Sequence, residues 1–263
     1  GPPNNELRRL PMTYCVAMAL DEGLLFASDS RTNAGVDHVS TFSKMSVFET
    51  PGERAIVLLN SGNLATTQAV VSTLRQALHS ERPNLMSAAT MFDVATLVGD
   101  AVRQVIHHHS SSQLAQSGVD FSCNFLVGGQ IAGDAPRLFL VYAEGNFIES
   151  SPDTPYFQIG ESKYGKPIID RVIRPSTPVD EAIKCALVSF DSTIKSNLSV
   201  GLPIDLAFVR RDECRVGLRH RIEPEDAYFG SIRRAWGQGL RKVFNELPDP
   251  EWLGAGREQG GRP

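Results

Sequence analysis

Met12 and Thr13 form the first pair in the chain whose residue types suggest covalent chemistry. A threonine hydroxyl is a poor nucleophile near neutral pH and needs an adjacent base to take its proton. Cells usually remove a methionine that precedes a small residue, and its removal would leave Thr13 with a free α-amine. Such an amine titrates near about pH 8, so part of it is unprotonated at physiological pH and can act as that base. Thr13 is therefore a candidate nucleophile of the N-terminal type.

The other residues that could bind a metal or form disulfides are less favourably arranged. His107, His108 and His109 are consecutive, so on a helix neighbouring side chains point about 100° apart and do not converge on one ion. Four cysteines lie far apart without a CxxC pair, three of them inside apolar runs: Cys15, Cys123, Cys185 and Cys214. We expect buried, reduced thiols, no metal site and no cofactor.

Composition and charge narrow the class of protein. Hydrophobic residues make up 41% of the 263 residues and charged residues 21%, which excludes disorder, collagen and coiled coil as the main architecture. The net charge of -4 supplies no basic field for a phosphate backbone. No run approaches the roughly 18 apolar residues of a membrane span, and the N-terminus lacks the layout of a secretory signal. We expect a cytoplasmic protein that binds neither nucleic acid nor membrane.

The length predicts one main domain with short additions at its ends. Residues 1–11 have no periodic apolar pattern and are expected to be a tag or linker remnant, which makes Met12 the natural start. Residues 253–263 form a glycine-rich polar segment, which predicts a mobile tail. The domain is expected to cover residues 12–252.

The hydrophobic pattern of that domain alternates between strand and helix periods. Strand-like runs lie at 13–20, 24–28, 38–48 and 54–59, and helical spacing follows at 63–83 and from 88 onward. Strands return at 121–127, 137–142 and 147–148, a third helix begins near 165–167, and a fourth, with Thr177 as its cap, ends near 196. Strands at 204–209 and 215–218 precede an amphipathic helix at 226–247.

This order of elements predicts the fold class. Consecutive hairpins interrupted by pairs of helices do not suit a parallel doubly wound sheet, in which single strands and helices alternate. They suit an α+β fold, a four-layer αββα sandwich of two antiparallel sheets with helices outside. This is the architecture of N-terminal nucleophile hydrolases.

A set of ordered short motifs resembles proteasome β-type subunits. The motifs are Thr13-Tyr-Cys-Val, Ser28-Asp-Ser-Arg31, Lys44, Ser61-Gly-Asn63 with Thr66-Thr-Gln68, Val127-Gly-Gly129 and Ile159-Gly-Glu-Ser162. The segments 27–38, 197–205 and 247–252 are similar, more narrowly, to the bacterial Anbu group, proteasome-like proteins called ancestral β subunits. The resemblance covers about residues 12–252.

The resemblance implies a role for each residue near the nucleophile. Lys44 would lower the pKa of the Thr13 amine by charge repulsion, and Asp29 would hold Lys44 in place as a buried carboxylate. Arg31 would help to balance the charge of Asp29, and the backbone N–H of Gly62 would stabilise the oxyanion. Each residue also has an ordinary alternative: a threonine can begin a strand, an aspartate can cap a turn, a lysine can be solvated, and a tight turn can require glycine.

Two serines are carried over as supporting residues, Ser162 and Ser199. Proteasome subunits usually have an aspartate three residues before a serine–glycine pair, whereas Ser196 and Ser199 occupy those places here and Val200 precedes Gly201. The usual acidic residue is therefore absent from the network that orients the amine, and this departure implies weak or altered activity.

The function that the resemblance implies is a self-assembling threonine peptidase acting through an acyl-enzyme. Its partners would be peptide or unfolded-protein substrates, further copies of itself in a ring or spiral of at least six subunits, and an unknown ATPase or adaptor. Two alternatives stay open: a hydrolase or amidotransferase acting on a small amide, and a structural assembly with a vestigial site. In either enzyme, a chain in which Thr13 remains peptide-bonded should be inactive.

Overall fold

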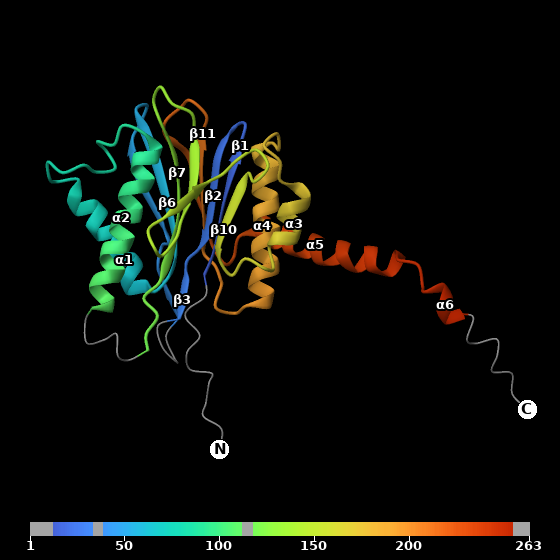
Figure 1. Cartoon of the computed structure of the whole chain (residues 1–263). Helices are drawn as coiled ribbons and strands as arrows, with labels where there is room; N and C mark the ends of the chain where they lie inside the picture. The colour runs from blue at the N-terminus through green and yellow to red at the C-terminus, as the bar shows by residue number, and fades with distance from the viewer. Residues whose placement is uncertain (1–12, 34–38, 112–117, 255–263) are drawn as a thin grey trace, which may run out of the picture. The chain divides into compact units, whose positions relative to one another are not determined.

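The computed structural model describes residues 13–33, 39–111 and 118–254 of the chain (Figure 1). The expected segment at 1–11 lies outside the described residues, as does all of the expected tail at 253–263 except residues 253 and 254, which end a short helix. The chain divides into two compact units, one ending at Asp226 and one beginning at Ala227, where the sequence predicts a single domain over 12–252. The second unit consists of α5 (Ala227–Glu246) and α6 (Glu251–Gly254).

The first unit contains two five-stranded sheets in which every ladder is antiparallel. One sheet has the order β10 (Tyr156–Gly160), β1 (Tyr14–Leu20), β2 (Gly23–Asp29), β11 (Ile204–Arg210), β12 (Val216–Ile222). The other has the order β5 (Met45–Thr50), β6 (Arg54–Gly62), β7 (Cys123–Ile131), β8 (Arg137–Val141), β9 (Phe147–Glu149). A small pair, β3 (Arg31–Asn33) and β4 (Val39–Thr41), follows β2.

Alternating residues of each strand face two different cores. Cys15 and Phe26 from the first sheet pack with Val57 and Leu59 from the second, in the layer between the sheets. Ile56 and its neighbours on the other face of β6 pack against α1 (Leu64–Ala77) and α2 (Met91–Ser110). Both faces are buried, which is why these strands are nearly continuous apolar runs.

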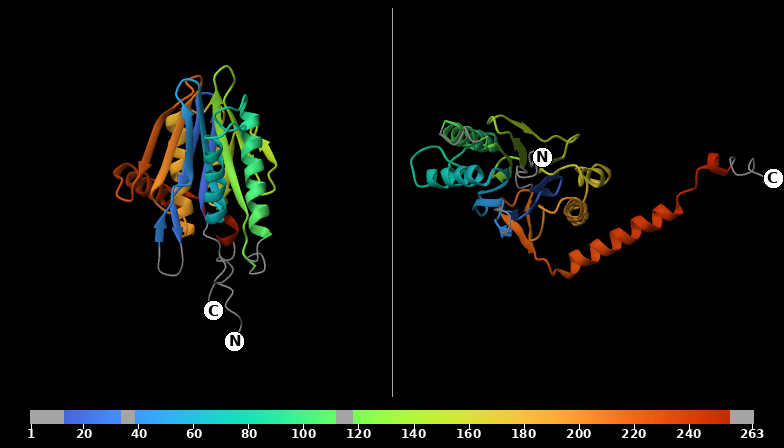
Figure 2. Two further views of the ribbon diagram at one scale, coloured as in Figure 1. Left: turned by 90° about the vertical axis from the view of Figure 1, so that its left-hand side faces the viewer. Right: turned by 90° about the horizontal axis from the view of Figure 1, so that it is seen from below.

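The outer face of the first sheet is covered by α4 (Val179–Ser196), with α3 (Lys166–Val172) beside it (Figures 1 and 2). The rings of Tyr14 on β1 and Phe190 on α4 lie 4.6 Å apart, and the Tyr14 hydroxyl donates to Ser189 Oγ at 2.9 Å. The layers therefore run helix, sheet, sheet, helix, and the predicted αββα sandwich is confirmed.

Several predicted boundaries are wrong in detail. Thr177 does not cap α4, because Pro178 occupies the cap position. Thr177 Oγ1 instead accepts from the N–H of Arg174 and donates to the carbonyl of Val172, and these two hydrogen bonds close the turn after α3. The run at 38–48 is two strands, because Ser43 forms hydrogen bonds with the backbone of Met45 at a break between β4 and β5. Strand β10 is absent from the prediction.

No helix among the described residues has both the length and the apolar character needed to cross a membrane. All four cysteines are buried and unpaired, as the sequence predicts.

Candidate active site

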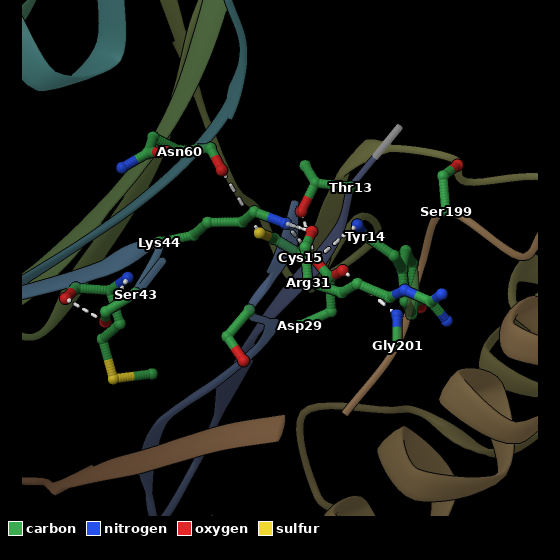
Figure 3. A network of polar contacts seen from close by, with 12 residues as sticks. Thr13, Tyr14, Cys15, Asp29, Arg31, Ser43, Lys44, Asn60, Ser199 and Gly201 are labelled. Atoms are coloured by element: carbon green, nitrogen blue, oxygen red, sulfur yellow. Dashed lines mark hydrogen bonds and ion pairs between the residues drawn. The ribbon is translucent and has the colours of Figure 1, made fainter. Parts of the chain in front are cut away.

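The β1–β2 hairpin brings Thr13 and Asp29 together. Thr13 immediately precedes β1 and Asp29 is the last residue of β2, and the antiparallel register pairs Cys15 with Ser28. The Thr13 hydroxyl donates to Asp29 Oδ1, and the N–H of Tyr14 donates to the same oxygen at 3.1 Å (Figure 3). Both side chains are buried, so the hydroxyl points at a carboxylate that water does not reach.

Lys44 reaches this carboxylate from the other sheet. It directly precedes β5, and its Nζ lies 2.9 Å from Asp29 Oδ1 and donates to the carbonyl of Arg31 at 2.8 Å. The N–H of Gly201 donates to the second oxygen of Asp29 at 3.3 Å. Asp29 thus accepts four hydrogen bonds from four residues, one of them charged, which compensates for the burial of the ion pair.

Burial also shifts the acidities of the groups in the cluster. It raises the pKa of Asp29, and the Lys44 ammonium and the hydrogen bonds from Thr13 and Tyr14 oppose that shift. Burial likewise raises the pKa of the Cys15 thiol, which donates to the carbonyl of Asn60 at 3.6 Å. The thiol beneath the site is therefore protonated and takes no part as a second nucleophile.

Arg31 contacts the cluster through its backbone carbonyl. Its carbonyl oxygen accepts from Lys44, whereas its Nε is buried without a hydrogen-bond partner, and no hydrogen bond among the described residues joins the guanidinium to Asp29. The side chain lies against Gly201, where an added Cβ would come within 2.6 Å of Arg31 Cδ. The expected charge balance from Arg31 is not made through a hydrogen bond.

Gly62 ends β6 with a φ of +112°, a conformation that favours glycine. A Cβ there would lie 2.5 Å from the carbonyl oxygen of Ser122 on the neighbouring chain segment. Helix α1 begins two residues later, capped by Asn63, whose side chain accepts from the N–H of Thr66, and its first turn holds no acidic residue. The partial positive charge of this helix end is therefore not neutralised within the first turn.

Thr13, Lys44 and Gly62 line one pocket of about 280 Å³, with α1 on its far side. A carbonyl group at the mouth of this pocket would lie beside both the threonine hydroxyl and the end of β6. The arrangement can support nucleophilic attack on a carbonyl carbon, with backbone groups near the oxygen.

Among the described residues, no hydrogen bond joins Ser199 or Ser162 to Thr13, Asp29 or Lys44. Ser199 donates through its N–H and its hydroxyl to Asn197 Oδ1, at 3.0 and 2.5 Å, and Figure 3 shows it apart from the Thr13–Asp29 contacts. Ser162 lines a different pocket, together with Lys166 and Asp170. Ser196 is exposed at the end of α4.

A second acidic residue, Glu161, contacts Thr13 through its backbone, and the sequence does not predict this contact. The N–H of Glu161 donates to the carbonyl of Thr13 at 2.7 Å, and its largely buried carboxylate accepts from Asn197 Nδ2 at 3.4 Å. Asn197 in turn holds Ser199. Sequence gives little signal for such a residue, since most glutamates are exposed.

No cluster of three or more histidine, cysteine or acidic side chains within the described ranges could hold a metal ion. The consecutive histidines end α2, where they are basic residues of the last turn.

Known proteins show the same sequence features and fold. Residues 13–209 match the family described as proteasome subunit. The structure is similar to Anbu (ancestral β-subunit) from Yersinia bercovieri, with 55% identity, a TM-score of 0.85, and coverage of 91% of this chain and 100% of that chain. It is also similar to the Anbu complex of Pseudomonas aeruginosa, described as a helical assembly, with 51% identity, a TM-score of 0.87, and coverage of 90% and 98%. Proteasome subunit beta 2 of Nitrosopumilus maritimus is 24% identical over 216 residues, 81% of this chain and 93% of the relative.

Proposed function

This chain belongs to the proteasome subunit family, within its Anbu group, and from that premise we propose that it is a threonine peptidase whose nucleophile is the hydroxyl of Thr13. The observation that carries the proposal is the shared carboxylate: Asp29 accepts from the Thr13 hydroxyl and from the Lys44 ammonium at the edge of one pocket. An ordinary strand-initiating threonine would not need a buried ion pair beneath it.

The reaction begins with removal of the residues before Thr13, which frees its α-amine. The amine takes the hydroxyl proton as Oγ attacks the carbonyl carbon, and the oxyanion forms beside the backbone of Gly62. The amine then protonates the leaving nitrogen, the C–N bond breaks, and an ester joins the acyl group to Thr13. Water, deprotonated by the same amine, hydrolyses the ester and restores the hydroxyl.

Asp29 is a poor substitute for that amine. Its two oxygens already accept from Lys44, Tyr14 and Gly201, so taking a further proton would weaken hydrogen bonds that depend on its charge. Asp29 and Lys44 are better suited to hold the hydroxyl and to supply a fixed positive charge near the amine.

The test compares a chain that begins at Thr13 with the chain that keeps residues 1–12. Turnover of peptide amides should appear only in the trimmed chain, because general base catalysis is worth roughly 10²- to 10⁴-fold. A trimmed Thr13→Ala chain is the control for contaminating peptidases. Equal turnover by both forms, with mass spectrometry showing the extension intact, would refute the amine mechanism. A free Thr13 that a covalent probe for N-terminal nucleophiles does not label would support the vestigial alternative.

We also propose self-association into an assembly of at least six subunits. Large apolar side chains recur at spacings of three and four along the end of α5 and at the residue that follows it, each more than half exposed: Leu240, Val243, Phe244 and Leu247. The similar Anbu complex of Pseudomonas aeruginosa is described as a helical assembly. Light scattering should give a mass of six chains or more, and Phe244→Glu should lower it; a monomer at micromolar concentration would refute this proposal.

A further inference from the structure

The pocket beside Thr13 contains polar side chains that none of the described residues satisfies. The exposed fractions of Asn60 and Ser46 are both 8%, and among the described residues neither side chain has a hydrogen-bond partner. Asn60 makes hydrogen bonds only through its backbone, which accepts from Cys15 Sγ and donates to the carbonyl of Lys44 at 3.0 Å. Neither side chain is among the buried unpaired groups of the described residues, so water in the pocket reaches their polar atoms. A bound side chain that displaces this water must replace its hydrogen bonds, or binding is weakened.

We infer that this pocket selects substrates with an uncharged, carboxamide-bearing side chain, that of glutamine or asparagine, on the acyl side of the cleaved bond. The inference rests on the proposed function, because Thr13 and Gly62 at the mouth of the pocket fix which residue of the substrate enters it. The Asn60 amide offers two hydrogen-bond donors and an acceptor, and the Ser46 hydroxyl can donate or accept a hydrogen bond. A carboxamide can satisfy donors and acceptors at the same time.

The charges around the pocket disfavour ionised side chains. Among the described residues that line it, Lys44 is the only charged one, and its ammonium is paired with Asp29. A cationic side chain would lose its hydration without meeting a carboxylate, and an anionic one would meet a lysine whose charge is already compensated. The pocket, at about 280 Å³, lies at the small end for ligand sites and suits one side chain.

The position of Asn60 makes it a rigid selector. It lies on β6, between β5 and β7, and pairs with Phe125 in the register of β7. Phe125 faces the core shared with α1 and α2, so Asn60 is on that side of the sheet too. A polar group on a strand held by both of its neighbours discriminates between side chains better than one on a loop, since its backbone is fixed.

The experiment measures kcat/KM of the chain beginning at Thr13 on acetyl-Ala-Ala-X-aminomethylcoumarin amides, where X is Gln, Met, Glu or Lys. We expect kcat/KM for the Gln substrate to exceed that for the Met and Glu substrates by at least about tenfold. A loss of this size is typical when binding leaves one buried polar group unpaired. Asn60→Asp should move the preference to Lys, a gain that a merely structural role would not give. Asn124→Asp is the matched control. Asn124 lies on β7, on the same face as Leu126, which packs between the two sheets and not toward the pocket, so this variant should keep the Gln preference.

A preference for Met equal to or above Gln, or an unchanged preference in Asn60→Asp, would overturn the inference. If the trimmed chain hydrolyses none of the four substrates, the proposed function fails, and binding decides the inference separately. In that case the trimmed Thr13→Ala chain should bind acetyl-Ala-Ala-Gln-amide at least about tenfold more tightly than the Met peptide in calorimetry, and equal binding would overturn it.

Discussion

Two acidic residues contact Thr13, Asp29 through its carboxylate and Glu161 through its backbone N–H, and the surroundings of their carboxylates differ. Asp29 ends a strand, is fully buried, and accepts four hydrogen bonds, one of them from Lys44. Glu161 follows a strand at the sheet edge, and its carboxylate has one hydrogen bond of 3.4 Å and a lysine, Lys163, at 3.8 Å whose side chain is 76% exposed. The side of the site that Asp29 forms, which we call the strand-built side, is therefore fixed. The side that Glu161 forms, which we call the loop-built side, is loosely held.

This difference predicts that substitutions on the strand-built side have larger effects than those on the loop-built side. We expect the largest effect from Lys44→Met. The substitution leaves Asp29 buried and unpaired, so we expect a loss of about 3–5 kcal/mol in the free energy of unfolding. Turnover by the trimmed chain should fall by roughly 10³-fold. Urea unfolding and kcat/KM measure the two effects. Lys44→Met combined with Asp29→Asn should recover stability without activity, and recovery of both would contradict a catalytic role for the pair.

Gly62→Ala tests the backbone at the mouth of the pocket. An alanine there meets the carbonyl of Ser122 at 2.5 Å and must also adopt a positive φ, so the end of β6 has to move. Removal of one oxyanion donor costs roughly 10²- to 10³-fold in kcat, and we expect a loss of that size. The matched control is Gly52→Ala, which has a φ of +85° and no atom within 4 Å of its new Cβ. Equal losses of kcat in the two variants would show that only backbone strain was measured.

The acidity of Asp29 predicts opposite pH trends for activity and stability. Burial raises its pKa, so it protonates above the value of about 3.9 for an ordinary aspartate, and kcat/KM should fall with falling pH in that region. Because the folded pKa is the higher one, the contribution of Asp29 to stability is full below the unfolded pKa and is lost as pH rises through the folded pKa. Denaturant unfolding at several pH values should show this loss, and Asp29→Asn should lack it.

Glu161→Gln tests the loop-built side and should have a small effect. The glutamine keeps an acceptor for Asn197 and removes only a charge that is poorly compensated. We expect kcat to change by less than about tenfold, with the KM nearly constant, because the pocket is lined by other residues. Ser162→Ala is the control in the neighbouring position and should leave both constants unchanged. A loss of kcat/KM as large as that of Lys44→Met would mean that the two sides of the site are equally important for turnover.

The sequence predicts the strand-built side of the site better than the loop-built side, and the reason is physical. Strands β1 and β2 are long apolar runs joined by a short turn, so their pairing places Thr13 near Asp29 with little ambiguity. Strand β10 has five residues and follows a proline-containing turn, and without that strand the position of Glu161 beside Thr13 is not visible. Its contact with Asn197, 36 residues away, is a tertiary pairing that leaves no local pattern.

The roles expected for Ser162 and Arg31 stay predictions. Ser162 follows Glu161, whose N–H contacts Thr13, and lines a pocket other than the one beside Thr13. For Arg31, residue type suggests a guanidinium contact, whereas the structure uses the carbonyl that every residue has. Sequence patterns identify charges but not which atom of a residue will be used.

The site is divided between the two sheets: Thr13 and Asp29 belong to the β1–β2 hairpin, while Lys44 and Gly62 belong to the strands of the other sheet. The apolar layer between the sheets, with Phe26, Val57 and Leu59, is what holds the two halves in alignment. A small slippage in this layer would separate the lysine from the hydroxyl while every hairpin stayed intact. We therefore expect activity to be lost where the packing between the sheets loosens, even in a compact state that keeps its secondary structure.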